Sequence, residues 1–149
     1  MERKPTILLA EDHPVNREVA EHILHRLGYD VDVAVDGREV LAAVRKKDYP
    51  LILMDLRMPE IDGFEATRRI HLEIPPERRP VIAAMTADVT HQNRERCRDL
   101  GMIAFITKPI EKKQLAKILE NYVDAGRGRA AEISGDGAAT GMPFPPDLQ

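Results

Sequence analysis

Residues 51–63 read LILMDLRMPEIDG, an apolar run that ends on an aspartate and continues into a loop with a proline and a glycine. The four apolar residues 51–54 predict a short strand that is buried on both faces, as in a parallel sheet. Functional side chains of such sheets lie just beyond the carboxyl ends of the strands. Asp55 is therefore the first candidate for a site residue.

Four further strand-like runs lie on either side of this one, and helical patterns separate them. The predicted strands are 6–10, 29–35, 51–54, 81–85 and 104–107. The predicted helices cover 14–27, a segment that opens at Asp36-Gly37, 64–72, the residues from Thr90 to Leu100, and 111–123. Strand and helix thus alternate five times. This order predicts an α/β fold: a doubly wound five-stranded parallel sheet with helices on both faces.

The composition changes near residue 125. The chain has 149 residues, and residues 125–149 hold five of its nine glycines and the run Pro143-Phe144-Pro145-Pro146. No apolar periodicity continues there, which predicts a flexible tail or linker. We expect one domain over residues 4–124 and a Gly/Pro-rich tail over 125–149.

Overall composition excludes several classes of protein. A net charge of −3 gives no basic surface for nucleic acid or an anionic membrane. The single cysteine, Cys97, allows no internal disulfide, and no apolar run is long enough to span a membrane. The first predicted strand begins at once, without room for a signal peptide. We expect a cytoplasmic protein that contacts neither nucleic acid nor membrane.

Polar side chains follow four of the predicted strands. Glu11 and Asp12 follow the first strand, Asp55 the third, Thr86 the fourth and Lys108 the fifth. Three carboxylates that converge on one sheet edge repel one another, so they must be protonated, paired or bound to a cation. Hard oxygen ligands of this kind suit Mg²⁺. Lys108 and the hydroxyl of Thr86 can each bind a phosphoryl oxygen. A carboxylate beside a metal ion and a lysine is a known type of phosphoryl-accepting nucleophile.

With these motifs in order, the chain resembles the response-regulator receiver domains of two-component systems over roughly residues 4–124. The matching motifs are Glu11-Asp12, Asp55-Leu56-Arg57-Met58-Pro59, Asp62-Gly63, Thr86-Ala87 and Lys108-Pro109. The resemblance implies a flavodoxin-like (βα)5 fold and a phosphorylation site at Asp55. It also implies a cis bond between Lys108 and Pro109.

The resemblance assigns further roles to single residues. Asp12 and Asp55 would bind Mg²⁺ directly, Glu11 through water, and the backbone carbonyl of Arg57 would add another oxygen. Lys108 would hold the phosphoryl group. Thr86 and Phe105 would form the switch pair, and output would pass through the face of the fourth helix, the fifth strand and the fifth helix.

A narrower resemblance points to receivers attached to hybrid histidine kinases, because the acidic pair is Glu-Asp and His13-Pro14-Val15-Asn16 follows it. A small single-domain regulator is equally compatible with the chain. The implied phosphodonor is a histidine kinase or a histidine phosphotransfer domain. As a monomer or weak dimer, the chain would catalyse only its own phosphorylation and dephosphorylation, without turnover.

Other α/β functions fit the motifs less well. Haloacid-dehalogenase-like phosphatases carry an Asp-x-Asp motif after a strand. In this chain the residue two positions after Asp55 is Arg57, not a second aspartate. A Rossmann-type nucleotide site needs a glycine-rich turn after the first strand, where this chain has Glu11-Asp12-His13-Pro14. A DNA-binding regulator is disfavoured, because no helix-turn-helix pattern follows Val123.

Two residues beside the site carry a separate hypothesis. Arg57 and Asp88 each lie two residues past a site residue, so an ion pair between them would flank the mouth of the site. Such a pair would hinder the water that hydrolyses an acyl phosphate; two independent solvated charges are the alternative. Cys97 is expected to be half-buried. Because arginines surround it in the sequence, a lowered pKa of its thiol is an open alternative.

Overall fold

The structure, a computed structural model, describes residues 5–124 of the chain. The tail predicted for residues 125–149 lies outside the described residues. The strands are β1 (Thr6–Ala10), β2 (Asp30–Ala34), β3 (Leu51–Asp55), β4 (Val81–Thr86) and β5 (Ala104–Thr107). The helices are α1 (Pro14–Arg26), α2 (Gly37–Lys46), α3 (Gly63–Glu73), α4 (His91–Asp99) and α5 (Lys112–Leu119). A 3₁₀ turn, η1 (Pro76–Arg78), precedes β4, and a π-helical segment, η2 (Glu120–Asp124), follows α5.

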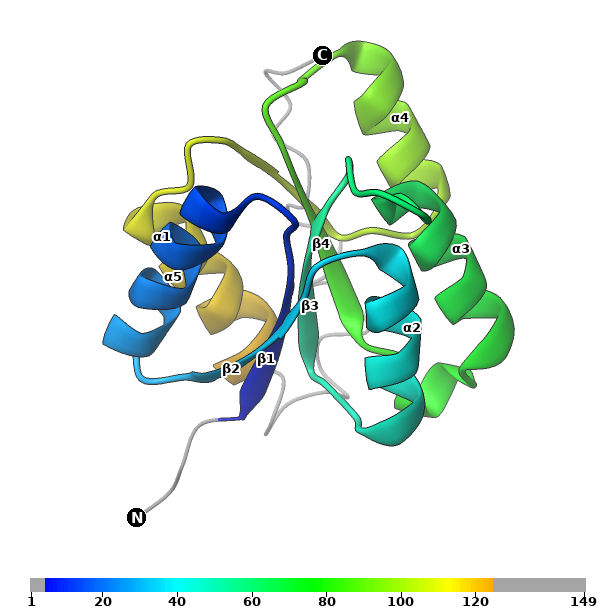
Figure 1. The fold of residues 1–149 in the computed structure, drawn as a ribbon, viewed down its shortest axis with the longest axis horizontal. Coiled ribbons are helices and arrows are strands. Elements are labelled where there is room, and N and C mark those ends of the chain that lie inside the picture. Colours follow the sequence, from blue (N-terminus) through cyan, green and yellow to red (C-terminus); the bar gives the residue numbers. More distant parts are fainter. Residues whose placement is uncertain (1–4, 125–149) are drawn as a thin grey trace.

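All pairings in the sheet are parallel, and the strand order is β2-β1-β3-β4-β5. This is the flavodoxin-like doubly wound order, so the predicted fold class is confirmed. Helices α1 and α5 lie on one side of the sheet, and α2, α3 and α4 lie on the other (Figure 1). The carboxyl ends of β1, β3, β4 and β5 therefore come side by side at one edge.

Alternate residues of each strand supply two separate cores. Ile52 and Met54 of β3 belong to the core beneath α2, α3 and α4, whereas Leu51 and Leu53 belong to the core beneath α1 and α5. Every residue of β3 is buried, which explains its continuous apolar composition. Full burial of each such aliphatic side chain contributes about 1.5–3 kcal/mol to stability. β3 is thus held rigidly from both faces, and so is the aspartate at its end.

Side-chain caps begin the helices on the α2/α3/α4 side. Asp36, Asp62 and Thr90 each accept a hydrogen bond from the backbone N–H three residues later. Such caps satisfy N–H groups that the first helical turn leaves free and contribute about 1 kcal/mol each. They fix where each helix starts relative to the loop that precedes it.

Candidate functional site

The predicted site residues other than Phe105 meet in one cleft at the carboxyl edge of the sheet. Its volume is about 580 Å³. It is lined by Glu11, Asp12, His13, Asn16, Asp55, Arg57, Thr86, Ala87, Asp88 and Lys108. Because the sheet order brings four strand ends together, residues up to 97 positions apart in the chain become neighbours.

Asp55 is the last residue of β3, and its position depends on the loop that follows. Gly63 donates its backbone N–H to the carbonyl of Leu56 at 3.1 Å, and a Cβ at Gly63 would overlap the backbone oxygen of Asp55. Asp62 caps α3 from the same turn. The Asp-Gly pair therefore lets the start of α3 approach the end of β3 closely, which fixes the orientation of Asp55.

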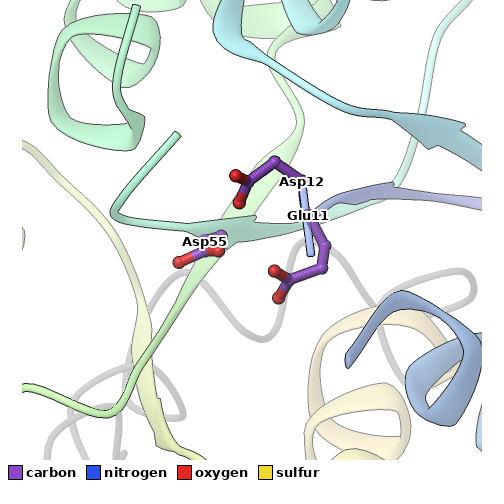
Figure 2. Close-up of side chains that lie close together, drawn as sticks. All are labelled: Glu11, Asp12 and Asp55. Carbon is purple, nitrogen blue, oxygen red and sulfur yellow. The ribbon is translucent and has the colours of Figure 1, made fainter. Parts of the chain in front are cut away.

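Three carboxylates gather at this point. One carboxylate oxygen each from Glu11, Asp12 and Asp55 lies within 4.8 Å of the others (Figure 2). Glu11 is 1% exposed and Asp55 is 4% exposed, whereas Asp12 is open to solvent. Two of the three charges are thus removed from water, which is unfavourable without a compensating cation.

Lys108 supplies one positive charge to the cluster. Its Nζ lies 2.8 Å from Glu11 Oε1 and 3.2 Å from Asp55 Oδ2. Burial acts to lower the pKa of Lys108, but the hydrogen bond to Glu11 and the charges of both carboxylates outweigh it and raise the pKa. Lys108 is therefore charged and bridges two of the three acids. Its peptide bond to Pro109 is cis, as the resemblance implied.

The single positive charge of Lys108 does not neutralise three carboxylates, and the pKa of Asp55 reflects the remaining negative charge. Burial, a hydrogen bond with Glu11 and the charge of Glu11 raise the pKa of Asp55 to about 7. Lys108 and the backbone N–H of Arg57, which donates to Asp55 Oδ1 at 3.1 Å, act in the opposite direction. A site of oxygen donors with surplus negative charge fits a small hard divalent cation such as Mg²⁺.

Thr86 and Phe105 lie on the two neighbouring strands beyond β3. Thr86 is buried at the end of β4, and its Oγ1 accepts the backbone N–H of Asp88 at 2.9 Å. Phe105 is buried in β5, beside Ala84 of β4, in the core beneath α2, α3 and α4. Phe105 thus lies within the predicted fifth strand, whereas Thr86, predicted to follow the fourth strand, is its last residue. Their switch role stays a prediction.

The predicted ion pair beside the site is confirmed. Arg57 Nη2 lies 3.0 Å from Asp88 Oδ2, although the two side chains are 77% and 35% exposed. The pair joins the loop after β3 to the loop after β4. Such an exposed pair contributes less than about 1 kcal/mol to stability. What matters is its place beside the site rather than its contribution to stability.

Other contacts were not anticipated from sequence. Arg17 Nη1 donates to the backbone carbonyls of Glu11 and Asp12, at 3.2 and 3.3 Å. Asn93 Nδ2 donates to the carbonyl of Asp88 at 3.1 Å. Arg17 and Asn93 each lie near the start of the helix that follows a site loop. This place in the sequence is the signal that could have predicted their contacts with the loop.

Cys97 differs from expectation. It is fully buried rather than half-buried, and burial raises the pKa of its thiol to about 12, against the smaller opposing effect of Arg96. The arginines around it in sequence therefore do not activate it.

Comparison with known proteins agrees with the geometry. A family model described as response regulator receiver domain matches residues 7–120. Hybrid signal transduction histidine kinase B of Dictyostelium discoideum is 40% identical over 124 residues, which cover 76% of this chain and 6% of that protein. Histidine protein kinase 1 of Candida albicans is 43% identical over 122 residues, which cover 76% of this chain and 5% of that protein. The chain thus spans a small part of the length of either kinase.

A solved structure has a similar fold. It is the receiver domain of the sensor histidine kinase PA1611 from Pseudomonas aeruginosa, with a magnesium ion coordinated in its active-site cleft. The two are 37% identical with a TM-score of 0.74, and the match covers 81% of this chain and 98% of that one. Within residues 5–124, no helix is both long and apolar enough to cross a membrane.

Proposed function

Since this chain belongs to the response regulator receiver domain family, we propose that it accepts a phosphoryl group on Asp55 from a phosphohistidine donor. One observation carries this proposal. The buried carboxylate of Asp55 faces Lys108 Nζ, Glu11 and Asp12 at the carboxyl edge of a rigid parallel sheet. The domain comprises residues 4–124, and residues 125–149 act as a tail or linker.

The transfer follows from the groups around Asp55. A carboxylate oxygen of Asp55 attacks phosphorus and forms the O–P bond, while the P–N bond to the donor imidazole breaks and the imidazole keeps the electron pair. Lys108 and Thr86 bind phosphoryl oxygens through their N–H and O–H donors. Mg²⁺, when bound, neutralises charge on the carboxylates and on the phosphoryl oxygens. Glu11, Asp12, Asp55 and the backbone carbonyl of Arg57 would hold it.

The phosphorylated form then switches the protein. Thr86 moves toward the phosphoryl group, Phe105 follows into the space released, and the face of α4, β5 and α5 changes. This is a shift between two states, of which the phosphoryl group binds one better. An output partner on this face would read the change.

The immediate partner is a histidine kinase or a histidine phosphotransfer domain, because the relatives include histidine kinases, one of them a hybrid signal transduction histidine kinase. The chain acts either as a single-domain regulator or as the receiver of such a kinase, in the cytoplasm, as a monomer or weak dimer. The phosphatase alternative is not favoured, because the residue where it needs an acid is Arg57, which pairs with Asp88.

The proposal is tested by incubating the protein with Mg²⁺ and acetyl phosphate and reading the intact mass. We expect the mass of one phosphoryl group to be added, to be lost in base, and to be absent in Asp55→Asn and in the presence of a chelator. Beryllofluoride, which mimics the phosphoryl group, serves as the second probe. A protein that gains no adduct and binds no beryllofluoride would contradict the proposal.

A further inference from the structure

Asp88 lies in the loop between β4 and α4 and makes hydrogen bonds in three directions. Its backbone N–H donates to Thr86 Oγ1 at 2.9 Å, and its carboxylate accepts from Arg57 Nη2 at 3.0 Å. Its backbone carbonyl accepts from Asn93 Nδ2 at 3.1 Å. Arg57 in turn donates its backbone N–H to Asp55 Oδ1 at 3.1 Å. Asp88 thus joins the loop after β3, the buried hydroxyl of Thr86 and helix α4.

Asn93 is the member of this set that belongs to α4. Its own N–H donates to Thr90 Oγ1 at 3.1 Å, so the residue is fixed in the capped first turn of the helix. Its side chain reaches back over that turn to Asp88. A displacement of the carbonyl of Asp88 therefore acts directly on the start of α4.

Helix α4 contributes few side chains to the core. Of its residues, only Arg94 and Cys97 are buried, and Arg96 lies over the ring of Phe64 in α3, 3.9 Å from its centroid. A segment with few buried apolar contacts shifts or opens at low free-energy cost. Its position is therefore sensitive to single polar contacts at its first turn, of which the amide of Asn93 makes one.

We propose that Asn93 is a positioning residue that couples the state of Thr86 to helix α4 through Asp88. This inference rests on the proposed function, in which the Thr86 hydroxyl binds the phosphoryl group. A hydroxyl has one proton to donate and two lone pairs, so Thr86 can donate to the phosphoryl oxygen and still accept the N–H of Asp88. When Thr86 moves toward Asp55, Asp88 follows, and the bond from Asn93 carries the movement into α4.

The test is amide hydrogen exchange of residues 91–99, measured with and without Mg²⁺ and beryllofluoride. Asn93→Ala and Asn93→Asp both remove the amide N–H donor, and they differ in charge, because only the aspartate adds a carboxylate near the helix N-terminus, where it is stabilising. Gln92→Ala is the matched control, since Gln92 is an exposed neighbour in the same turn. Binding of beryllofluoride is followed separately by its ¹⁹F signal.

We expect beryllofluoride to change the exchange of residues 91–99 in the wild type and in Gln92→Ala. In both Asn93 variants the effect should shrink by about fivefold, the factor by which one neutral hydrogen bond shifts an equilibrium. Bound beryllofluoride should give the same ¹⁹F signal in every variant.

A purely structural role of Asn93 would change exchange equally with and without beryllofluoride, and that result would overturn the proposal. So would a wild type that binds beryllofluoride without any response in α4. A wild type with no bound ¹⁹F signal would instead refute the proposed function on which the coupling rests.

Discussion

Replacing Asp55 with asparagine should stabilise the metal-free protein. Asp55 is 4% exposed, and burial together with the hydrogen bond and charge of Glu11 raises its pKa from 3.8 to about 7. A rise of this size corresponds to about 4 kcal/mol of folding free energy. The amide has nearly the same shape and no charge. We therefore expect the free energy of unfolding of Asp55→Asn to exceed that of the wild type by about 2–4 kcal/mol near pH 8.

The pH dependence follows from the sign of the shift. An acid whose pKa is raised in the folded state binds protons more tightly when folded. Its stabilising contribution is complete below the unfolded pKa of 3.8 and is lost as the pH rises through about 7. The advantage of Asp55→Asn should therefore fall to about 1–2 kcal/mol near pH 5 and disappear near pH 3.8.

Urea denaturation near pH 8 and near pH 5, with a chelator present, measures the difference in free energy of unfolding between Asp55→Asn and the wild type. Asp99→Asn is the matched control, because it removes an exposed carboxylate at the end of α4. Saturating Mg²⁺ should cancel the advantage, since the ion stabilises only a form that binds it well. An Asp55→Asn protein no more stable than the wild type near pH 8, or equally favoured at both pH values, would refute the reasoning.

Three further predictions concern the surroundings of Asp55. In Arg57→Ala, loss of the exposed ion pair with Asp88 should speed loss of the phosphoryl group by about two- to fivefold, as followed by intact mass; an unchanged rate would count against a shielding role. In Gly63→Ala, the new Cβ overlaps the backbone oxygen of Asp55, so urea denaturation should show a loss of about 1–3 kcal/mol, and wild-type stability would contradict the close approach. Native Cys97 should react with a thiol reagent far more slowly than in urea, because burial, opposed only in part by Arg96, raises its pKa to about 12 and leaves on the order of a thousandfold less thiolate; equal rates would contradict its burial.

The sheet could be predicted from sequence because each buried strand is a short apolar run between turn residues. The bounds of β1 and β5 agree with the prediction. The last helix was expected to continue to residue 123, but regular α-helix ends at Leu119 and η2 follows. Val123 is still buried through this wider turn. The spacing of apolar residues predicts which of them are buried, but it does not distinguish an α-helix from a π-helix.

The site was predictable to the extent that topology alone creates it. Parallel strands bring the chain positions of Glu11, Asp55 and Lys108 to the same sheet edge, and that meeting was expected from their places at or just after strand ends. The bond from Asn93 to Asp88 depends on how the β4–α4 loop folds back, which residue types do not specify. The full burial of Cys97 was likewise hidden by the charged residues around it in sequence.

The central claim is that Asp55, and no other acid of the cluster, accepts the phosphoryl group. Borohydride reduces an aspartyl phosphate to homoserine, and peptide mapping then locates the modified residue. After phosphorylation with acetyl phosphate and Mg²⁺, we predict homoserine at position 55 and unmodified side chains at Glu11 and Asp12. A phosphorylated protein whose reduced residue is any other than Asp55 would contradict the account.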